Sequence, residues 1–283
     1  MKALSSRFCG SCVVTGTLLC LFLFAMLHLL RPDYNPLRRF MSEYLVGPFG
    51  FLGTAAAYLL AATLIMLLVG LWRSVRSCGF LAASCVLLGV MVISVCVCAV
   101  FPSDVLRPDG SHSTFTRACI IHLASSAVLY VSLIILLLIL PSAYRRDENW
   151  RPFSHVTLLL GFLILASVVG FILAPFYLRG LAQRATGLSV LVWLLLTGLR
   201  LRQAISEPFV KAALLFATAV TFIILVASSV FRILSSFATP KTNPYPYWGL
   251  VVLCIAMGTL SLWRGIVELL AYLRERKIES SLR

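Results

Sequence analysis

Charged residues are scarce in this chain. Only 12% of its 283 residues are Asp, Glu, Lys or Arg, whereas 60% are apolar. Ordinary soluble domains are about 25% charged and about 45–50% apolar. The composition therefore excludes a soluble globular enzyme, a disordered regulator and a disulfide-stapled secreted module. It indicates a polytopic membrane protein whose solvent is the bilayer.

Motifs for metal binding and nucleophilic catalysis are also lacking. The sequence holds no pair of Cys-x-x-Cys segments and no His-Glu-x-x-His helix, which are typical of zinc sites. It has no Gly-x-Ser-x-Gly turn of the kind that presents a nucleophilic serine. The nine cysteines all fall within or beside apolar runs, where free Cys packs as a small apolar side chain. We therefore expect no metal and no cofactor, and the sequence leaves open whether the protein is an enzyme.

Acidic residues are fewer than basic ones. Asp and Glu number 10 against 24 Lys and Arg, so that the formal net charge is +14. The basic stripe interleaved with aromatic residues that marks nucleic-acid binding is missing. Most of the positive charge lies in short loops between apolar runs, as the positive-inside rule describes. We expect membrane lipids as partners and no nucleic acid.

Long apolar runs are abundant. A transmembrane helix needs about 20 such residues, and eight runs qualify. They extend from Cys12 to Leu30, Pro48 to Trp72, Cys78 to Phe101, Arg117 to Leu140, His155 to Leu178, Ala185 to Leu201, Phe209 to Phe237 and Tyr247 to Leu270. The sequence thus predicts an all-α bundle of eight transmembrane helices. Residues 1–204 would form a six-span core, 205–272 two additional helices and 273–283 a cytoplasmic tail.

The distribution of basic residues predicts the orientation of the chain. If the N-terminus is cytoplasmic, most of the Lys and Arg residues lie on the inner side, which favours a cytoplasmic position for both termini. The first outer loop departs from this rule, because it carries Arg31, Arg38 and Arg39. Such a departure needs a local reason, such as a partner acid or an anionic headgroup. The expected location is the cell membrane, as a multi-pass protein.

Polar residues gather at the predicted outer edge of the spans. Ionisable groups near hydrocarbon are costly, so each is a functional hypothesis. The candidate cluster comprises Ser42, Glu43, Asp104, His122 and Arg184, with Ser103, His112, Gln183, Arg38 and Arg39 as secondary candidates. Because these residues come from four spans, acid, imidazole and guanidinium groups can converge there.

Each member of the cluster also has a structural interpretation. Glu43 suits the positive end of a helix, and Ser42 suits a helix cap. Asp104 can close a turn, and His122 can be a core imidazole bonded to a carbonyl. Arg184 can extend to the membrane interface or pair with one of the acids. A nucleophilic triad and a metal site have the weakest support, whereas a proton relay, a substrate site and a structural clamp all predict the same residues.

The order and spacing of these motifs resemble the domain of unknown function 998 (DUF998) membrane family over roughly residues 12–204. The motifs are Pro36…Ser42-Glu43…Gly47-Pro48, Phe101-Pro102-Ser103-Asp104, His122 and Gly180-Leu181-x-x-Arg184. The resemblance implies a six-span core and a prokaryotic plasma membrane. Gln183 stands where the family usually has Glu, and the last two predicted spans lie outside the family core.

Three functions fit these features. The first is the binding or processing of a lipid-like or amphiphilic substrate at the extracytoplasmic face, because the polar cluster lies beside a basic loop that can hold a phosphate-bearing headgroup. The second is proton-coupled transport of a small solute, which favours repeat symmetry and broken helices. The third is a non-enzymatic membrane scaffold or sensor.

Overall fold

The computed structural model describes residues 6–105 and 115–202, and this part of the chain is entirely helical. Its long helices are α1 (Ser6–Leu30), α2 (Gly50–Ser74), α3 (Gly79–Val100), α4 (Arg117–Tyr144), α5 (Phe153–Leu173) and α6 (Arg179–Leu201), and its short 3-10 helices are η1 (Met41–Leu45) and η2 (Phe176–Leu178). All six long helices are long and apolar enough to cross a membrane. The all-helical prediction is therefore confirmed for the described residues, which form a multi-pass membrane protein.

Several predictions fall on residues that the structure does not describe. These are the seventh and eighth spans, the tail over 273–283 and the candidate His112. The division of the chain at residue 204 and the cytoplasmic position of both termini also stay predictions.

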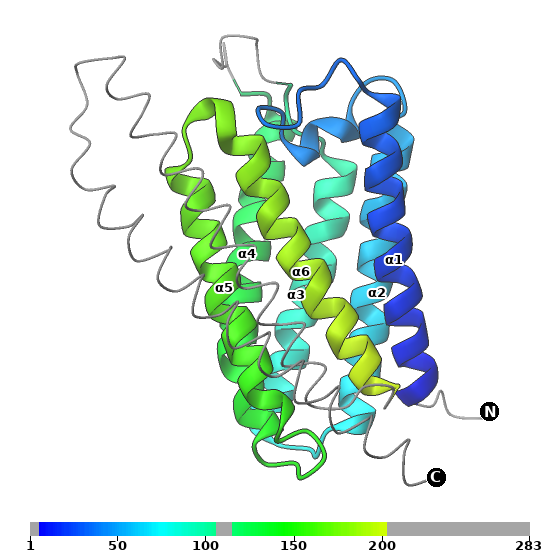
Figure 1. Cartoon of the computed structure of the whole chain (residues 1–283), viewed down its shortest axis with the longest axis vertical. Coiled ribbons are helices and arrows are strands. Elements are labelled where there is room, and N and C mark those ends of the chain that lie inside the picture. Colours follow the sequence, from blue (N-terminus) through cyan, green and yellow to red (C-terminus); the bar gives the residue numbers. More distant parts are fainter. Residues whose placement is uncertain (1–5, 106–114, 203–283) are drawn as a thin grey trace, which may run out of the picture.

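The six helices form a closed ring in chain order. Each helix packs against the next, and α6 returns to pack against α1. Figure 1 shows the alternating directions of the helices, with α6 lying between α5 and α1. The connection over residues 31–49, which contains η1, crosses one end of the ring. We call this end the loop end, and there α1, α3 and α5 finish while α2, α4 and α6 begin.

Glycines bring the helices close together at the end opposite the loop end. A Cβ added to Gly10 in α1 would lie 2.7 Å from the carbonyl oxygen of Gly198 in α6. A Cβ on Gly70 in α2 would lie 2.8 Å from the side chain of Leu201. Small residues at helix interfaces let transmembrane backbones approach closely. The ring is therefore tightly closed in this half.

Polar contacts fix the α4–α5 connection to its neighbours at the same end. The indole N–H of Trp150 donates to Ser74 Oγ at 2.9 Å, and Arg200 donates to the carbonyl of Asn149. A polar cavity of about 530 Å³ lies here, lined by Ser6, Arg73, Ser74, Asn149, Trp150 and Arg200. These contacts join α2 and α6 to the connection.

The observed ends of α5 and α6 differ from the predicted ones. The fifth helix ends at Leu173 rather than Leu178, because the residue before a proline is driven out of the helical region and Ala174 has ψ 136°. The sixth begins at Arg179 rather than Ala185. Its first turns carry polar side chains that lower the hydropathy without interrupting the helix.

Close packing at Gly10 leads to the first prediction. In Gly10→Leu the new side chain must displace the backbone of α6, so we expect a loss of about 1–3 kcal/mol of stability. Thermal unfolding in detergent measures it. Gly89→Leu is the matched control, because nothing lies within 4 Å of a Cβ at Gly89. An equal drop in melting temperature for both variants would contradict close packing of α1 against α6.

Candidate functional site

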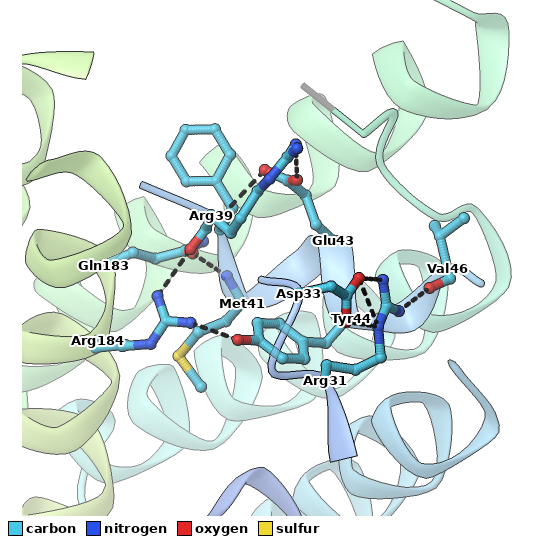
Figure 2. A network of polar contacts seen from close by, with 10 residues as sticks. Arg31, Asp33, Arg39, Met41, Glu43, Tyr44, Val46, Gln183 and Arg184 are labelled. Atoms are coloured by element: carbon cyan, nitrogen blue, oxygen red, sulfur yellow. Dashed lines mark hydrogen bonds and ion pairs between the residues drawn. The ribbon is translucent and has the colours of Figure 1, made fainter. Parts of the chain in front are cut away.

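The candidate site lies at the loop end, where the residue 31–49 connection is bonded to α6. Figure 2 shows the residues of this network, which converge from the connection and from the first turn and a half of α6. Its members combine carboxylate, guanidinium and amide groups with backbone carbonyls. The connection is thereby held across the end of the helix ring.

Glu43 is the buried acid of this network. Its carboxylate is fully buried and forms an ion pair with Arg39, with 2.9 Å between Arg39 Nη1 and Glu43 Oε2. The other oxygen accepts the backbone N–H of Phe40 at 3.1 Å, which caps the first turn of η1. Glu43 therefore lies in the first turn of η1, where it also neutralises Arg39, and its functional role stays a prediction.

Arg31 anchors the two ends of the connection to each other. It is bonded to both carboxylate oxygens of Asp33, the shortest distance being 2.8 Å from Nη2 to Oδ2. Nη1 also donates to the carbonyls of Val46 and Pro48. The hydrogen bonds from Arg31 lower the pKa of Asp33, so the pair persists when the pH falls through the ordinary range of a carboxyl group.

The excess of arginine in this loop thus has a local cause. Two of its three arginines are paired with acids of the same connection, Arg31 with Asp33 and Arg39 with Glu43. The third, Arg38, is exposed. Partner acids were one of the two reasons that the sequence suggested for the departure from the positive-inside rule.

Arg184 binds the connection to α6. Its Nη1 donates to the carbonyls of Pro36 and Arg39, both at 2.7 Å, and Nη2 donates to the hydroxyl of Tyr44 at 3.3 Å. Its Nε donates to Nε2 of His28 in α1 at 2.8 Å. One guanidinium therefore joins α1, the connection and α6.

The charge of Arg184 is not matched by an acid in the described part of the chain. The ion pairs there use Asp33 and Glu43 for other arginines. One interpretation of the sequence was an ion pair between Arg184 and one of the acids, Glu43 or Asp104. The structure instead gives Arg184 neutral acceptors. Carbonyl dipoles solvate the guanidinium without cancelling its charge.

His28 is fixed as a neutral imidazole by its two partners. Nδ1 lies 2.6 Å from the carbonyl oxygen of Phe24 and must donate to it. Nε2 accepts from Arg184 and therefore carries no proton. The ring also stacks on Tyr44, with 5.1 Å between the centroids. His28 lies in the last turn of α1.

Close packing explains why the motif of α6 begins with a glycine, Gly180. A Cβ there would lie 2.5 Å from the carbonyl oxygen of Arg39 and 2.6 Å from that of Pro36. These are the carbonyls to which Arg184 donates one turn later. Gln183 completes the attachment, since its Oε1 accepts the backbone N–H of Met41 at 2.6 Å.

An apolar cavity lies beneath this network, inside the helix ring. Its volume is about 410 Å³. The polar residues of its lining, within the described part of the chain, are Cys20, His28, Tyr130, Gln183 and Arg184. The remaining lining residues are Leu21, Phe24, Ala25, Met41, Leu60, Leu64, Met91, Val95, Leu129, Leu133, Gly187, Leu188, Val190 and Leu191. Most of the polar residues lie at the loop end, so the cavity is an apolar chamber with a polar cap.

Asp104 and His122 belong to a separate set of contacts at the α3–α4 junction. The Asp104 carboxylate accepts from the backbone N–H and the hydroxyl of Thr116, at 2.8 and 2.7 Å, at the residue that caps α4. His122 is buried, and its Nδ1 donates to the carbonyl of Phe101 at 2.8 Å. The expected convergence of four spans on one site is therefore replaced by two local sets of contacts.

The remaining sequence candidates stand apart from the chamber. Ser103 is buried, and its hydroxyl has no hydrogen-bond partner among the described residues. Ser42 is half-buried within η1. Within residues 6–105 and 115–202 no group of three His, Cys, Asp or Glu side chains is placed to hold a metal ion.

Sequence reasoning missed several residues of the capped chamber. Tyr44, Tyr130 and Gly187 carry no motif that distinguishes them from ordinary core residues. His28 offered one signal, because an imidazole one helical turn from the end of an apolar run needs polar partners on both nitrogens. Gln183 and Arg39 were secondary candidates, and both take part in the network.

The comparison with known families gives one match. A family model described as "Protein of unknown function (DUF998)" matches residues 14–200, which is well over half of the chain. This confirms the resemblance in the sequence motifs. Comparisons with curated proteins and with solved structures find no match.

Gly180 provides a prediction for the attachment of the connection. In Gly180→Ala the methyl group would overlap the carbonyls that Arg184 binds, so the connection must move away from α6. Trypsin cleavage after Arg38 and Arg39 in detergent should then be about tenfold faster, since 1.4 kcal/mol of local destabilisation corresponds to a factor of ten. Gly187→Ala is the control on the same helix, because the nearest atom to its Cβ is Met41 Sδ at 3.6 Å. Unchanged cleavage in Gly180→Ala would rule out this attachment.

Proposed function

The chain belongs to the DUF998 family, and from the geometry of its loop end we propose that it binds an amphiphilic molecule of the membrane. The apolar part of the ligand occupies the chamber inside the helix ring, and its polar head lies at the cap formed by His28, Gln183 and Arg184. This places the ligand at the same face that the sequence suggested, with the chamber as the main binding element.

One observation carries this proposal, namely an apolar chamber whose polar lining lies mostly at one end. Small-molecule pockets measure about 300–1,000 Å³ and are mostly apolar, with a few placed polar groups. The chamber fits this description at about 410 Å³. A volume of this order suits a single-chain amphiphile better than a complete two-chain phospholipid. Apolar cavities in proteins stay dry and take up apolar ligands.

The exposed part of the lining indicates where the ligand enters. Leu21 and Ala25 on α1 and Leu188 on α6 line the chamber and are exposed. The lining residues Leu64, Met91 and Leu133, from α2, α3 and α4, are buried. The chamber is therefore accessible on its α1–α6 side, and the ligand enters laterally from the bilayer. The basic-residue distribution further supports an extracytoplasmic loop end, and the family resemblance implies a plasma-membrane location.

The positions of the acids in the described residues favour binding over proton-coupled transport. The six helices contain no Asp or Glu, whereas proton relays through membranes are commonly built from intramembrane acids and histidines. Glu43 is engaged with Arg39, and Asp104 with Thr116. A scaffold function would not need an internal chamber.

Filling the chamber tests the proposal. In Gly187→Leu the new side chain extends into the chamber, so a long-chain fluorescent fatty alcohol should bind at least about tenfold more weakly than to the unaltered protein, a loss of about 1.4 kcal/mol. The uncharged alcohol reports on the chamber and not on the charge of the cap. Fluorescence titration in detergent micelles measures the affinity.

Gly89→Leu adds the same side chain outside the chamber and should leave the affinity unchanged. If the two variants bind the alcohol equally well, or if the unaltered protein does not bind it, the proposal fails. Melting temperatures of both variants verify that each remains folded.

A further inference from the structure

The polar cap of the chamber offers hydrogen-bond donors. Gln183 uses its oxygen to accept from Met41. Its amide also forms a hydrogen bond with the hydroxyl of Tyr130, which leaves one of the two amide hydrogens for a ligand. Arg184 has two hydrogens on Nη2, and the Tyr44 hydroxyl takes one of them. Among the residues that the structure describes, no carboxylate lines the chamber. A ligand head at this end therefore meets donors and a positive charge.

The imidazole of His28 at the cap does not change this surplus of donors and positive charge. His28 donates to Phe24 through Nδ1 and accepts from Arg184 through Nε2, so both of its nitrogens are already used. It holds the guanidinium in place and leaves the positive charge at the chamber. The acids nearest to the cap neutralise Arg31 and Arg39 instead.

The half-buried guanidinium of Arg184 is hydrogen-bonded to neutral acceptors, and Glu43, the acid that acts on it electrostatically, forms its ion pair with Arg39. Burial weakens the screening of the guanidinium charge by water, which increases the attraction of a counter-ion in the same place. Charge-assisted hydrogen bonds to carboxylate or phosphate oxygens are shorter and about twice as strong as neutral ones. The cap is thus complementary to an anion.

We propose that the ligand head is anionic, a carboxylate or a phosphate monoester on a single apolar chain, and that Gln183 and Arg184 recognise it. This inference rests on the proposed function, because the apolar chain occupies the chamber described above. Gln183 selects for the charge of the head, since its amide is a donor where a carboxylate would repel an anion. Arg184 supplies the positive charge and is itself positioned by His28 and by the carbonyls of the connection.

The variant Gln183→Glu tests the head group without removing the attachment of the connection. A glutamate oxygen can still accept the backbone N–H of Met41, but it replaces a donor by a negative charge at the cap. Binding of a fluorescent long-chain fatty acid, titrated at a pH where it is ionised, should weaken at least tenfold. Binding of the corresponding alcohol should change less than twofold, and binding of the corresponding amine should become tighter.

Asn35→Asp is the matched control. Asn35 is exposed on the same connection, and its side-chain oxygen accepts the backbone N–H of Leu37 at 2.9 Å. The same amide-to-acid change there adds a negative charge outside the chamber, so the affinity for the fatty acid should stay within about twofold. A loss as large as in Gln183→Glu would mean that only the overall charge of the loop end matters, and would overturn the proposal.

An alkyl phosphate of the same chain length separates the two possible heads. Tighter binding of the phosphate than of the fatty acid, both weakened by Gln183→Glu, would assign a phosphate monoester, and the reverse order would assign a carboxylate. Equal effects of Gln183→Glu on acid and alcohol would overturn the anionic head while leaving the chamber intact. Absence of alcohol binding to the unaltered protein would instead remove the proposed function itself.

Discussion

The structure of the loop end depends on the hydrogen bonds that the guanidinium of Arg184 donates. Its donors reach the carbonyls of Pro36 and Arg39, the hydroxyl of Tyr44 and the imidazole of His28. Without it the connection over residues 31–49 would lose its main bond to α6, because the other links are the Gln183–Met41 bond and one backbone bond from Leu181 to Leu37. A guanidinium suits this place because five donors in a planar fork can serve several acceptors at once. The same hydrogen bonds that attach the connection to α6 therefore form the cap of the chamber.

The chamber lies away from the closest helix contacts of the ring. At the end opposite the loop end, Gly10 and Gly198 let α1 and α6 touch, and Gly70 admits Leu201 between α2 and α6. Nearer the loop end, Phe24 of α1 and Gly187 and Leu191 of α6 line the chamber. Because the connection covers the chamber, the loop end combines an apolar interior with polar groups.

The sequence predicts the helices well and the site only in part. Hydropathy alone locates the six described spans, since each is a run of apolar residues long enough for the bilayer. It places the start of α6 too late, because Arg179, Gln183 and Arg184 look like a loop while serving as the first turns of a helix. Polar motifs point to Glu43, Gln183 and Arg184, but not to their partners. Arg184 binds backbone carbonyls, and carbonyls are present at every residue, so no pattern of side chains could reveal that contact. The expected meeting of Asp104 and His122 with the other candidates fails for the same reason, since Phe101 and Thr116 satisfy them locally.

The acids near the loop end are already bonded to other groups, which limits their use in acid–base chemistry. For Glu43 to act as a general base it would have to release Arg39 and the N–H of Phe40, which breaks the ion pair of a buried carboxylate and uncaps the first turn of η1. Asp104 would have to release the hydroxyl and the N–H that start α4. A cluster whose acids are committed to structure retains its positive charge and its donors as the groups that can respond to a ligand. These commitments support the proposed recognition of an anion at the cap, where the guanidinium of Arg184 is hydrogen-bonded to neutral acceptors.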